Sequence, residues 1–187
     1  MAEINAANVA KLSQITNAGM MDCKRALTEA QGAMDKAVEL LRKKGAATAA
    51  HKAAREAREG IVVAHVAPDA RTGILVEVNC ETDFVAKNED FKNFAHEISL
   101  QVAATAPSYV EKDKIPTEVL EKEKKLFVEE AKNSGKPENV IEKIVQGRLE
   151  TYYSEVALLS QPYFRDPKKT VSDLLNEIIA KTGEKII

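Results

Sequence analysis

The sequence turns from a predicted strand to a predicted helix at Asn79-Cys80-Glu81-Thr82-Asp83-Phe84-Val85-Ala86-Lys87-Asn88. Residues 74–78, which precede this stretch, form a mainly β-branched run of strand length. After the stretch, apolar residues recur at helical spacing from Phe91 to Val102. The stretch is therefore predicted to be a short surface connection, a place where a rigid scaffold often carries its functional groups.

Phe84 has two interpretations within this connection. A ring that faces solvent would suit insertion into a partner, because a large exposed apolar group usually has something to cover it. Alternatively, the ring folds back beneath its own loop and joins the core, where Phe is more often found. Composition alone favours the core.

Length, composition and charge limit the class of protein. A chain of 187 residues can bury a substantial core and hold one ordinary domain with a small additional module. The net charge of -2, with 30% charged residues of both signs, predicts a soluble protein without a general attraction to nucleic acid or anionic membrane. The sequence contains no apolar run of membrane-spanning length and does not start like a secretory signal. We therefore expect a cytoplasmic protein that binds neither nucleic acid directly nor a membrane.

The cysteines and histidines do not form a metal-binding pattern. Cys23 and Cys80 are far apart, and His51, His65 and His96 are scattered along the chain. Both cysteines fall on apolar faces of predicted elements, where a reduced thiol behaves as a small core residue. We expect no metal site and no cofactor.

Residues 1–45 are predicted to form a compact module of three short helices. The apolar positions of these helices are Val9 and Leu12, then Met20, Cys23, Leu27 and Ala30, and then Met34, Ala37, Val38 and Leu41. A core of this size is marginal, so some apolar surface is expected to stay open. Met20 and Met21 either belong to that surface, because Met adapts to a partner's shape, or simply fill the core.

A linker at residues 46–59 and a core domain at residues 60–187 follow. The linker is rich in Ala, Lys, Arg and Glu, so it favours helix without large apolar groups to anchor it. Residues 61–66 and 74–80 are predicted strands that pair as an antiparallel hairpin, covered by the helix from Asn88. Because two strands alone are marginal, a further strand is expected from elsewhere in the chain.

The second half of the core domain reads as helical. Two long helices at about residues 115–155 form a predicted antiparallel hairpin, joined by Asn133-Ser134-Gly135-Lys136-Pro137. A last helix is expected to start after Thr170 and to stop at Gly183. The predicted class is thus α+β: a three-helix module, then a small antiparallel sheet packed by helices, with a helical hairpin.

Several motifs together resemble the translation elongation factor Ts family over nearly the whole chain. They are Val9-Ala10-Lys11-Leu12, Gly19-Met20-Met21-Asp22-Cys23-Lys24-Arg25-Ala26-Leu27, Val78-Asn79-Cys80-Glu81-Thr82-Asp83-Phe84-Val85-Ala86-Lys87-Asn88, Gly135-Lys136-Pro137, Gly147-Arg148-Leu149 and Gln161-Pro162-Tyr163-Phe164. The combination of Met-Met-Asp-Cys-Lys with Thr-Asp-Phe-Val at this separation is specific to the family.

The resemblance implies a guanine nucleotide exchange factor for the GTPase elongation factor Tu, with no covalent chemistry of its own. It implies that Phe84 inserts beside the magnesium site of the GTPase, with Asp83 as a polar anchor and Thr82 and Val85 as shoulders, and that the segment helps to displace the ion. This reverses the preference for a buried Phe84.

The resemblance also assigns a second contact and a partner. It implies an N-terminal module of the ubiquitin-associated-like (UBA-like) type, in which Val9, Leu12, Met20 and Met21 match the surface that grips the nucleotide-binding domain. The expected partner is elongation factor Tu, both GDP-bound and nucleotide-free. The length fits the short form of the family, which often forms a two-to-two complex, so a homodimer is possible in that assembly.

The chain departs from the family pattern in two places. Ala10 and Ser13 stand where many relatives have Lys and Arg, and Asn17 replaces a glycine, which weakens the case for charged contacts by the first helix. Relatives also continue beyond the equivalent of Gly183-Glu184-Lys185-Ile186 into a closing strand, whereas this chain stops at Ile187. If that strand is missing, an open sheet edge is expected.

Two other classes of function are open to the sequence. An enzyme could use Glu81 and Asp83 as paired carboxylates, but these residues have no recognisable Ser, His or Cys partner. A generic interaction module without exchange activity is the stronger alternative.

Overall fold

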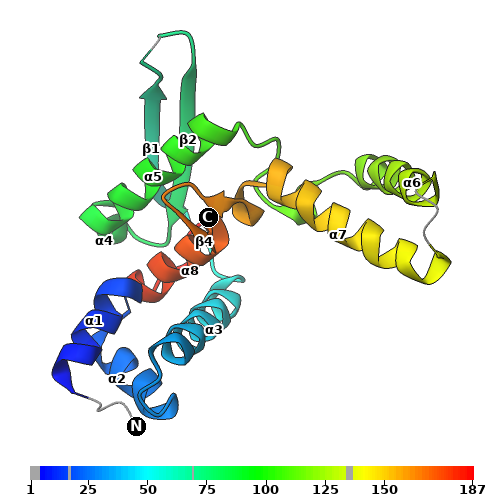
Figure 1. Ribbon diagram of the computed structural model, residues 1–187. Helices are drawn as coiled ribbons and strands as arrows, with labels where there is room; N and C mark the ends of the chain where they lie inside the picture. Colours follow the sequence, from blue (N-terminus) through cyan, green and yellow to red (C-terminus); the bar gives the residue numbers. More distant parts are fainter. Residues whose placement is uncertain (1–4, 17, 69, 134–136) are drawn as a thin grey trace. The chain divides into compact units, whose positions relative to one another are not determined.

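The computed structural model describes residues 5–16, 18–68, 70–133 and 137–187. Within them, α-helices dominate and two small antiparallel sheets have two strands each, which confirms the predicted α+β class (Figure 1). The chain forms two compact units, Met1–Leu100 with Asp173–Ile187, and Gln101–Ser172. The predicted boundaries at residues 45 and 59 stay a prediction.

The first unit begins with three helices, α1 (Ala6–Thr16), α2 (Met20–Glu29) and α3 (Met34–Lys52). They pack around a small shared core, as the apolar spacing predicts. Its buried members are Val9, Leu12, Cys23, Ala26, Leu27, Ala30 and Ala37. The likeness to a UBA domain stays a prediction. Asn17, which departs from the family pattern, lies outside the described residues.

Helix α3 is longer than the predicted module. It continues past Gly45 to Lys52, so half of the predicted linker is helical, in keeping with its high helix propensity. Its end is tied to the chain terminus, because the Lys52 ammonium donates a hydrogen bond to the Gly183 carbonyl. The last helical turn is thus fixed by a polar contact and not by a large apolar side chain.

Strands β1 (Glu59–Val66) and β2 (Gly73–Cys80) form the predicted antiparallel hairpin. Their register runs from Glu59 opposite Cys80 to Val66 opposite Gly73. Exposure alternates along β2 and ends with Val78 and Cys80 buried, as expected for a strand with one covered face. In the predicted turn between the strands, Asp69 lies outside the described residues.

In place of the further strand that the stability argument predicts, the end of the described chain adds one isolated bridge to β2, and the sheet keeps two strands. Asn79 and Ile187 exchange backbone hydrogen bonds of 2.8 and 3.0 Å, and Ile186 forms an antiparallel bridge with Cys80. Ile186 is buried by this contact, with 4% of its surface exposed. Only the terminal residues of the described chain make this pairing, so the addition is short.

Helix α4 (Asp83–Ala86) and most of α5 (Glu89–Thr105) and α8 (Val171–Thr182) complete the first unit. The apolar face of α5 is buried, with Phe91 fully inaccessible to solvent. Helix α8 starts directly after Thr170 and stops at Gly183, as predicted. Gly183 has a φ of 75°, a left-handed conformation that glycine adopts without the strain of a Cβ.

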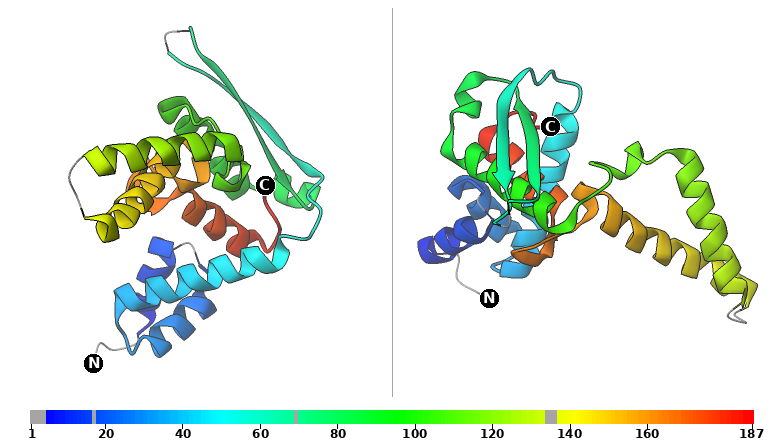
Figure 2. Two further views of the ribbon diagram at one scale, coloured as in Figure 1. Left: turned by 90° about the vertical axis from the view of Figure 1, so that its right-hand side faces the viewer. Right: turned by 90° about the horizontal axis from the view of Figure 1, so that it is seen from above.

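The second unit contains the predicted helical hairpin, α6 (Thr117–Asn133) and α7 (Glu138–Val156) (Figure 2). Ala131, Ile141 and Val145 are buried between the two helices. Residues 134–136 of the predicted connection lie outside the described residues. The remaining elements are short: η1 (Lys112–Lys114), η2 (Leu158–Ser160), β3 (Pro162–Tyr163) and β4 (Asp166–Thr170).

A buried amide pair explains part of the Gln161-Pro162-Tyr163-Phe164 motif. Gln101 is fully buried and Gln161 is 2% exposed, and the Gln101 amide donates to Gln161 Oε1 at 3.1 Å. Gln101 Oε1 in turn accepts a hydrogen bond from the Phe164 backbone at 2.9 Å. Buried polar groups need such partners, so this part of the motif is structural.

We predict that Gly60→Ala destabilises the protein. Gly60 lies opposite Asn79, and a Cβ would stand 2.5 Å from Asn79 Oδ1 and 2.8 Å from Asn79 Cα, closer than real atoms approach. Relieving this overlap should cost about 1 to 3 kcal/mol, measured by thermal or urea unfolding. Gly73→Ala in the same hairpin is the control, because a Cβ there meets nothing within 4 Å. Equal stability of the two variants would contradict the packing described for Gly60.

Candidate functional site

The candidate site is the segment Thr82–Val85, which the structure folds into a single helical turn at the end of β2. Helix α4 spans Asp83–Ala86, and Thr82 is its N-cap, with an extended backbone and a side-chain oxygen that accepts from Val85 N at 3.5 Å. A Thr cap followed by an acidic residue is a favourable helix start. The sequence indicated a connection here; the turn of helix within it is an additional finding.

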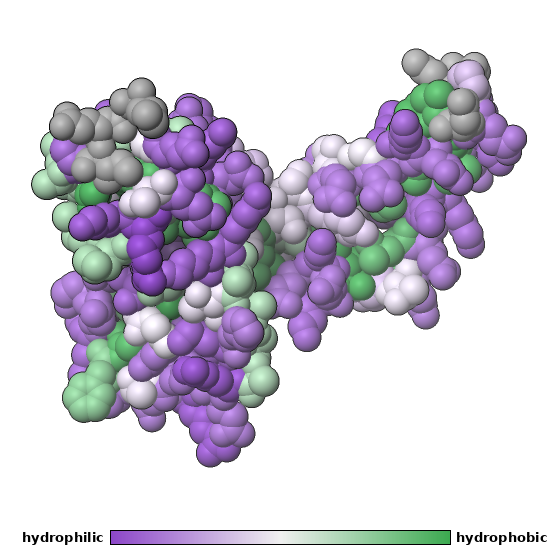
Figure 3. Space-filling model, turned by 90° about the horizontal axis from the view of Figure 1, so that it is seen from below, coloured by the Kyte–Doolittle hydropathy of each residue, from purple (hydrophilic) through white to green (hydrophobic). Residues whose placement is uncertain are grey.

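Phe84 points away from the body of its own chain. Its side chain is 81% exposed, the largest value among the exposed large hydrophobic residues of the described chain. Ala86 on the same turn is buried, at 8%, and Val85 is half-buried. The alternative of a buried Phe84 is therefore wrong. The face seen in Figure 3 is largely hydrophilic with small hydrophobic areas.

Asp83 carries a negative charge beside the ring. Lys87 Nζ lies 2.7 Å from Asp83 Oδ2, and this hydrogen bond is the main reason that the pKa of Asp83 falls below its ordinary value. Both side chains are at least half exposed, so the ion pair contributes little to stability. The carboxylate can therefore exchange Lys87 for a partner's polar group at small cost.

Two acidic side chains, Glu81 and Glu184, hold the start of the segment. Glu184 accepts hydrogen bonds from the backbone of Glu81 and of Thr82, each at 3.0 Å. Glu81 accepts one from the backbone of Lys185, and this bond, followed by the charge of Arg55, lowers the pKa of Glu81. Sequence reasoning missed Glu184; its one signal was its place in the Gly183-Glu184-Lys185-Ile186 motif.

The predicted N-terminal contact residues lie in two different environments. Val9 and Leu12 are 7% and 0% exposed and belong to the core of the three-helix module. Met20 and Met21 are 51% and 69% exposed, so they lie on the surface and do not fill the core. Ile15, at 44%, is a further exposed apolar residue that sequence reasoning did not select. Of the four predicted contact residues, the methionines are thus exposed, while Val9 and Leu12 are buried in the core of the module.

The thiol groups are structural. Burial is the main cause that raises the pKa of both the Cys23 and the Cys80 thiol, so each stays protonated at neutral pH. Cys80 Sγ lies 3.2 Å from the Thr82 carbonyl oxygen, to which it donates. This contact adds to the restraint on the start of the candidate site.

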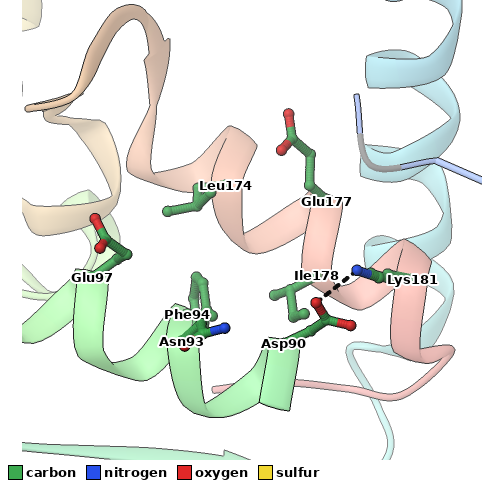
Figure 4. Close-up of a pocket in the computed structure, with 8 residues that line it drawn as sticks. All are labelled: Asp90, Asn93, Phe94, Glu97, Leu174, Glu177, Ile178 and Lys181. Atoms are coloured by element: carbon green, nitrogen blue, oxygen red, sulfur yellow. Dashed lines mark ion pairs between the residues drawn. The ribbon is translucent and has the colours of Figure 1, made fainter. Parts of the chain in front are cut away.

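A separate pocket lies between α5 and α8 in the first unit (Figure 4). Phe94, Leu174 and Ile178 supply its apolar lining, and an ion pair of 2.8 Å between Lys181 and Asp90 lies at its edge. The described residues contain no group of three or more His, Cys, Asp or Glu that could hold a metal ion. Within that same part of the chain, none of the helices has the length and apolar character required to cross a membrane.

Comparison with known proteins identifies the family. Residues 93–186 match the family model described as elongation factor TS. Proteins named elongation factor Ts from Caldanaerobacter subterraneus subsp. tengcongensis and Moorella thermoacetica are 57% and 56% identical, each over 98% of this chain and over 92% and 91% of their own lengths. The elongation factor Ts of Thermotoga petrophila is 53% identical over 98% of this chain and 92% of its own length. The chain therefore belongs to the elongation factor Ts family and is a translation elongation factor.

Proposed function

We propose that this chain is a guanine nucleotide exchange factor for the GTPase elongation factor Tu and that it acts in the cytoplasm by binding alone. The observation that supports this most is Phe84, presented 81% exposed on a capped turn within the Thr-Asp-Phe-Val motif. An isolated exposed aromatic beside a charged carboxylate suits a cleft that is apolar on one side and polar on the other. Membership of the family supplies the partner.

In the proposed mechanism, the Thr82–Val85 segment enters the GTPase beside its magnesium site. The partner's Mg²⁺ bridges phosphate oxygens and protein groups, so it neutralises charge that would otherwise repel. Phe84 acts as the wedge, and the Asp83 carboxylate anchors the segment on a polar group of the partner. Shifting the ion or its water shell weakens all phosphate contacts together, and GDP is released.

The size of the effect requires more than one contact. If bound nucleotide weakens the binding of the exchange factor to the GTPase by some factor, the exchange factor must weaken nucleotide binding by the same factor. To accelerate GDP release about ten-thousandfold at an unchanged rate of GDP association, the coupling free energy between the exchange factor and GDP must be roughly 5.5 kcal/mol. One buried aromatic supplies about 1.5 to 3 kcal/mol. A second contact through Met20 and Met21, both exposed, is therefore part of the proposal.

The proposal includes both states of the partner and the stoichiometry. The chain binds elongation factor Tu with GDP and without nucleotide, and a two-to-two complex containing a homodimer of this chain is the assembly we propose. Neither nucleic acid nor membrane takes part. The alternative, an interaction module without exchange activity, would bind the GTPase and leave the rate of GDP release unchanged.

We predict that Phe84→Ala loses most exchange activity and keeps its stability. Release of fluorescent GDP from purified elongation factor Tu should be fast with catalytic amounts of the natural chain and about ten- to a hundredfold slower with the variant. The melting temperature should barely change, because the ring is exposed. Phe91→Ala, which empties a fully buried site, is the control for stability and should lose about 3 to 5 kcal/mol.

The outcomes of this assay separate the two functions. A natural chain that binds the GTPase without accelerating release would establish the passive module. An active chain whose Phe84→Ala variant keeps full activity would instead remove Phe84 from the mechanism and leave the exchange function standing.

We also predict that replacing both Met20 and Met21 by Ser weakens binding to elongation factor Tu more than it slows GDP release from the bound complex. Both side chains are exposed, so the isolated chain should unfold at nearly its natural temperature. The concentration needed for half-maximal exchange should rise about tenfold or more, with a smaller change in the maximal rate. Leu126→Ser, which alters an exposed apolar residue on α6 of the second unit, is the matched control. If the control has the larger effect, the three-helix module is not the second contact.

A further inference from the structure

We propose that Glu184 is a positioning residue for the Phe84 segment. Its carboxylate fixes the start of the Thr82–Val85 turn, so that Phe84 is presented to the partner in one orientation. The proposal rests on the exchange function described above and assigns a role to a residue near the end of the chain, 103 positions from the backbone that it holds.

Both oxygens of the Glu184 carboxylate are engaged by the segment. Oε2 accepts from Glu81 N and Thr82 N, each at 3.0 Å, and Oε1 accepts from the Thr82 hydroxyl at 2.6 Å. Hydrogen bonds to a charged acceptor are shorter and stronger than neutral ones, and three of them on one group restrict its direction. The Thr82 hydroxyl gives its proton to Glu184 and still accepts from Val85 N, so the cap of α4 is itself oriented by Glu184.

The backbone of Glu184 is held in place on both sides. On one side, α8 ends at Thr182, and the Glu184 amide donates to Thr182 Oγ1 at 3.4 Å. On the other, Ile187 pairs with Asn79 along the edge of β2, and Ile186 is buried. Glu184 therefore reaches the segment from a fixed backbone and not from a free end.

The contact is reciprocal, because Glu81 holds the backbone that follows Glu184. Glu81 Oε1 accepts from Lys185 N at 2.5 Å, while the Glu81 amide donates to Glu184. Arg55, just beyond α3, lies 3.3 Å from Glu81 Oε1, and its carbonyl accepts from the Lys185 ammonium at 2.7 Å. The positive charge of Arg55 thus faces the Glu81 carboxylate, and the Lys185 ammonium binds the backbone of Arg55.

The ring depends on this arrangement for its direction. Helix α4 has only four residues, and a helix this short is not stable by itself. Phe84, 81% exposed, is directed mainly by the turn that carries it. If the cap loosens, only a fraction of molecules presents the ring correctly, and the apparent affinity for the partner falls by that fraction.

The test is a double-mutant cycle in the full chain, with Glu184→Ala and Glu184→Gln made alone and together with Phe84→Ala. We expect Glu184→Ala to lower the exchange rate at limiting concentration by about tenfold, and Glu184→Gln, which keeps one carbonyl acceptor, to lower it less. In the Phe84→Ala background, the Glu184 substitutions should add almost nothing, because they act through the ring. Equal losses in both backgrounds would show a merely structural role and overturn the proposal.

Glu77→Ala is the matched control, since this carboxylate lies on β2, close in sequence to the Thr82–Val85 segment, but accepts from Asn79 Nδ2 and not from the backbone of the segment. It should leave the exchange rate near its natural value. A loss as large as that of Glu184→Ala would mean that removing any acidic group from this region is sufficient, which would also overturn the proposal.

A second measurement does not depend on exchange activity. In the isolated chain, hydrogen exchange of the Thr82 and Val85 amides should become at least about tenfold faster in Glu184→Ala, with amides in α2 unchanged. Unchanged protection of Thr82 and Val85 would overturn the positioning role even if the chain proved to be a passive binder. Faster hydrogen exchange in Glu184→Ala, together with a natural chain that does not accelerate GDP release, would support the positioning role and contradict the nucleotide exchange function.

Discussion

Two carboxylates, those of Glu81 and Glu184, hold the end of β2. Each accepts hydrogen bonds from backbone amides at or beside the other residue. Glu184 accepts from the amides of Glu81 and Thr82, and Glu81 accepts from the amide of Lys185. These bonds join a strand, the start of α4 and the chain terminus at one place. They satisfy backbone donors that would otherwise be left at the end of the sheet, where the chain changes direction. The orientation of Phe84 follows from this junction.

The first unit separates residues that stabilise it from residues that it displays. Val9, Leu12 and Phe91 are buried, and substituting them would empty a core. Phe84 and the two methionines are exposed, and substituting them should cost little stability. This separation makes the proposed contacts with a partner experimentally accessible, because loss of activity and loss of folding can be measured in different variants of the same unit.

The structure contains the longer helices and the hairpin that local spacing predicts, whereas the turn α4 and the short strands β3 and β4 were not predicted. Alternation in residues 74–80 and helical periodicity after Phe91 are properties of neighbours in sequence, so one sequence is sufficient to read them. The direction of Phe84 could not be read this way, because a four-residue turn has no period from which to infer a buried face. Val9 and Leu12 were assigned to a contact surface by resemblance, whereas a three-helix module needs them in its small core.

The sequence by itself determined the class of fold, the helices and the hairpin, and the motif that carries Phe84, because each depends on residue types at short separation. Only the tertiary structure decided that the ring faces outward and that Glu184 holds the turn beneath it. Glu184 and Thr82 are 102 positions apart, and a hydrogen bond over that distance depends on where β2 and α8 both end. The spacing of residues along the sequence does not predict such a long-range contact, because it results from the packing of the whole unit.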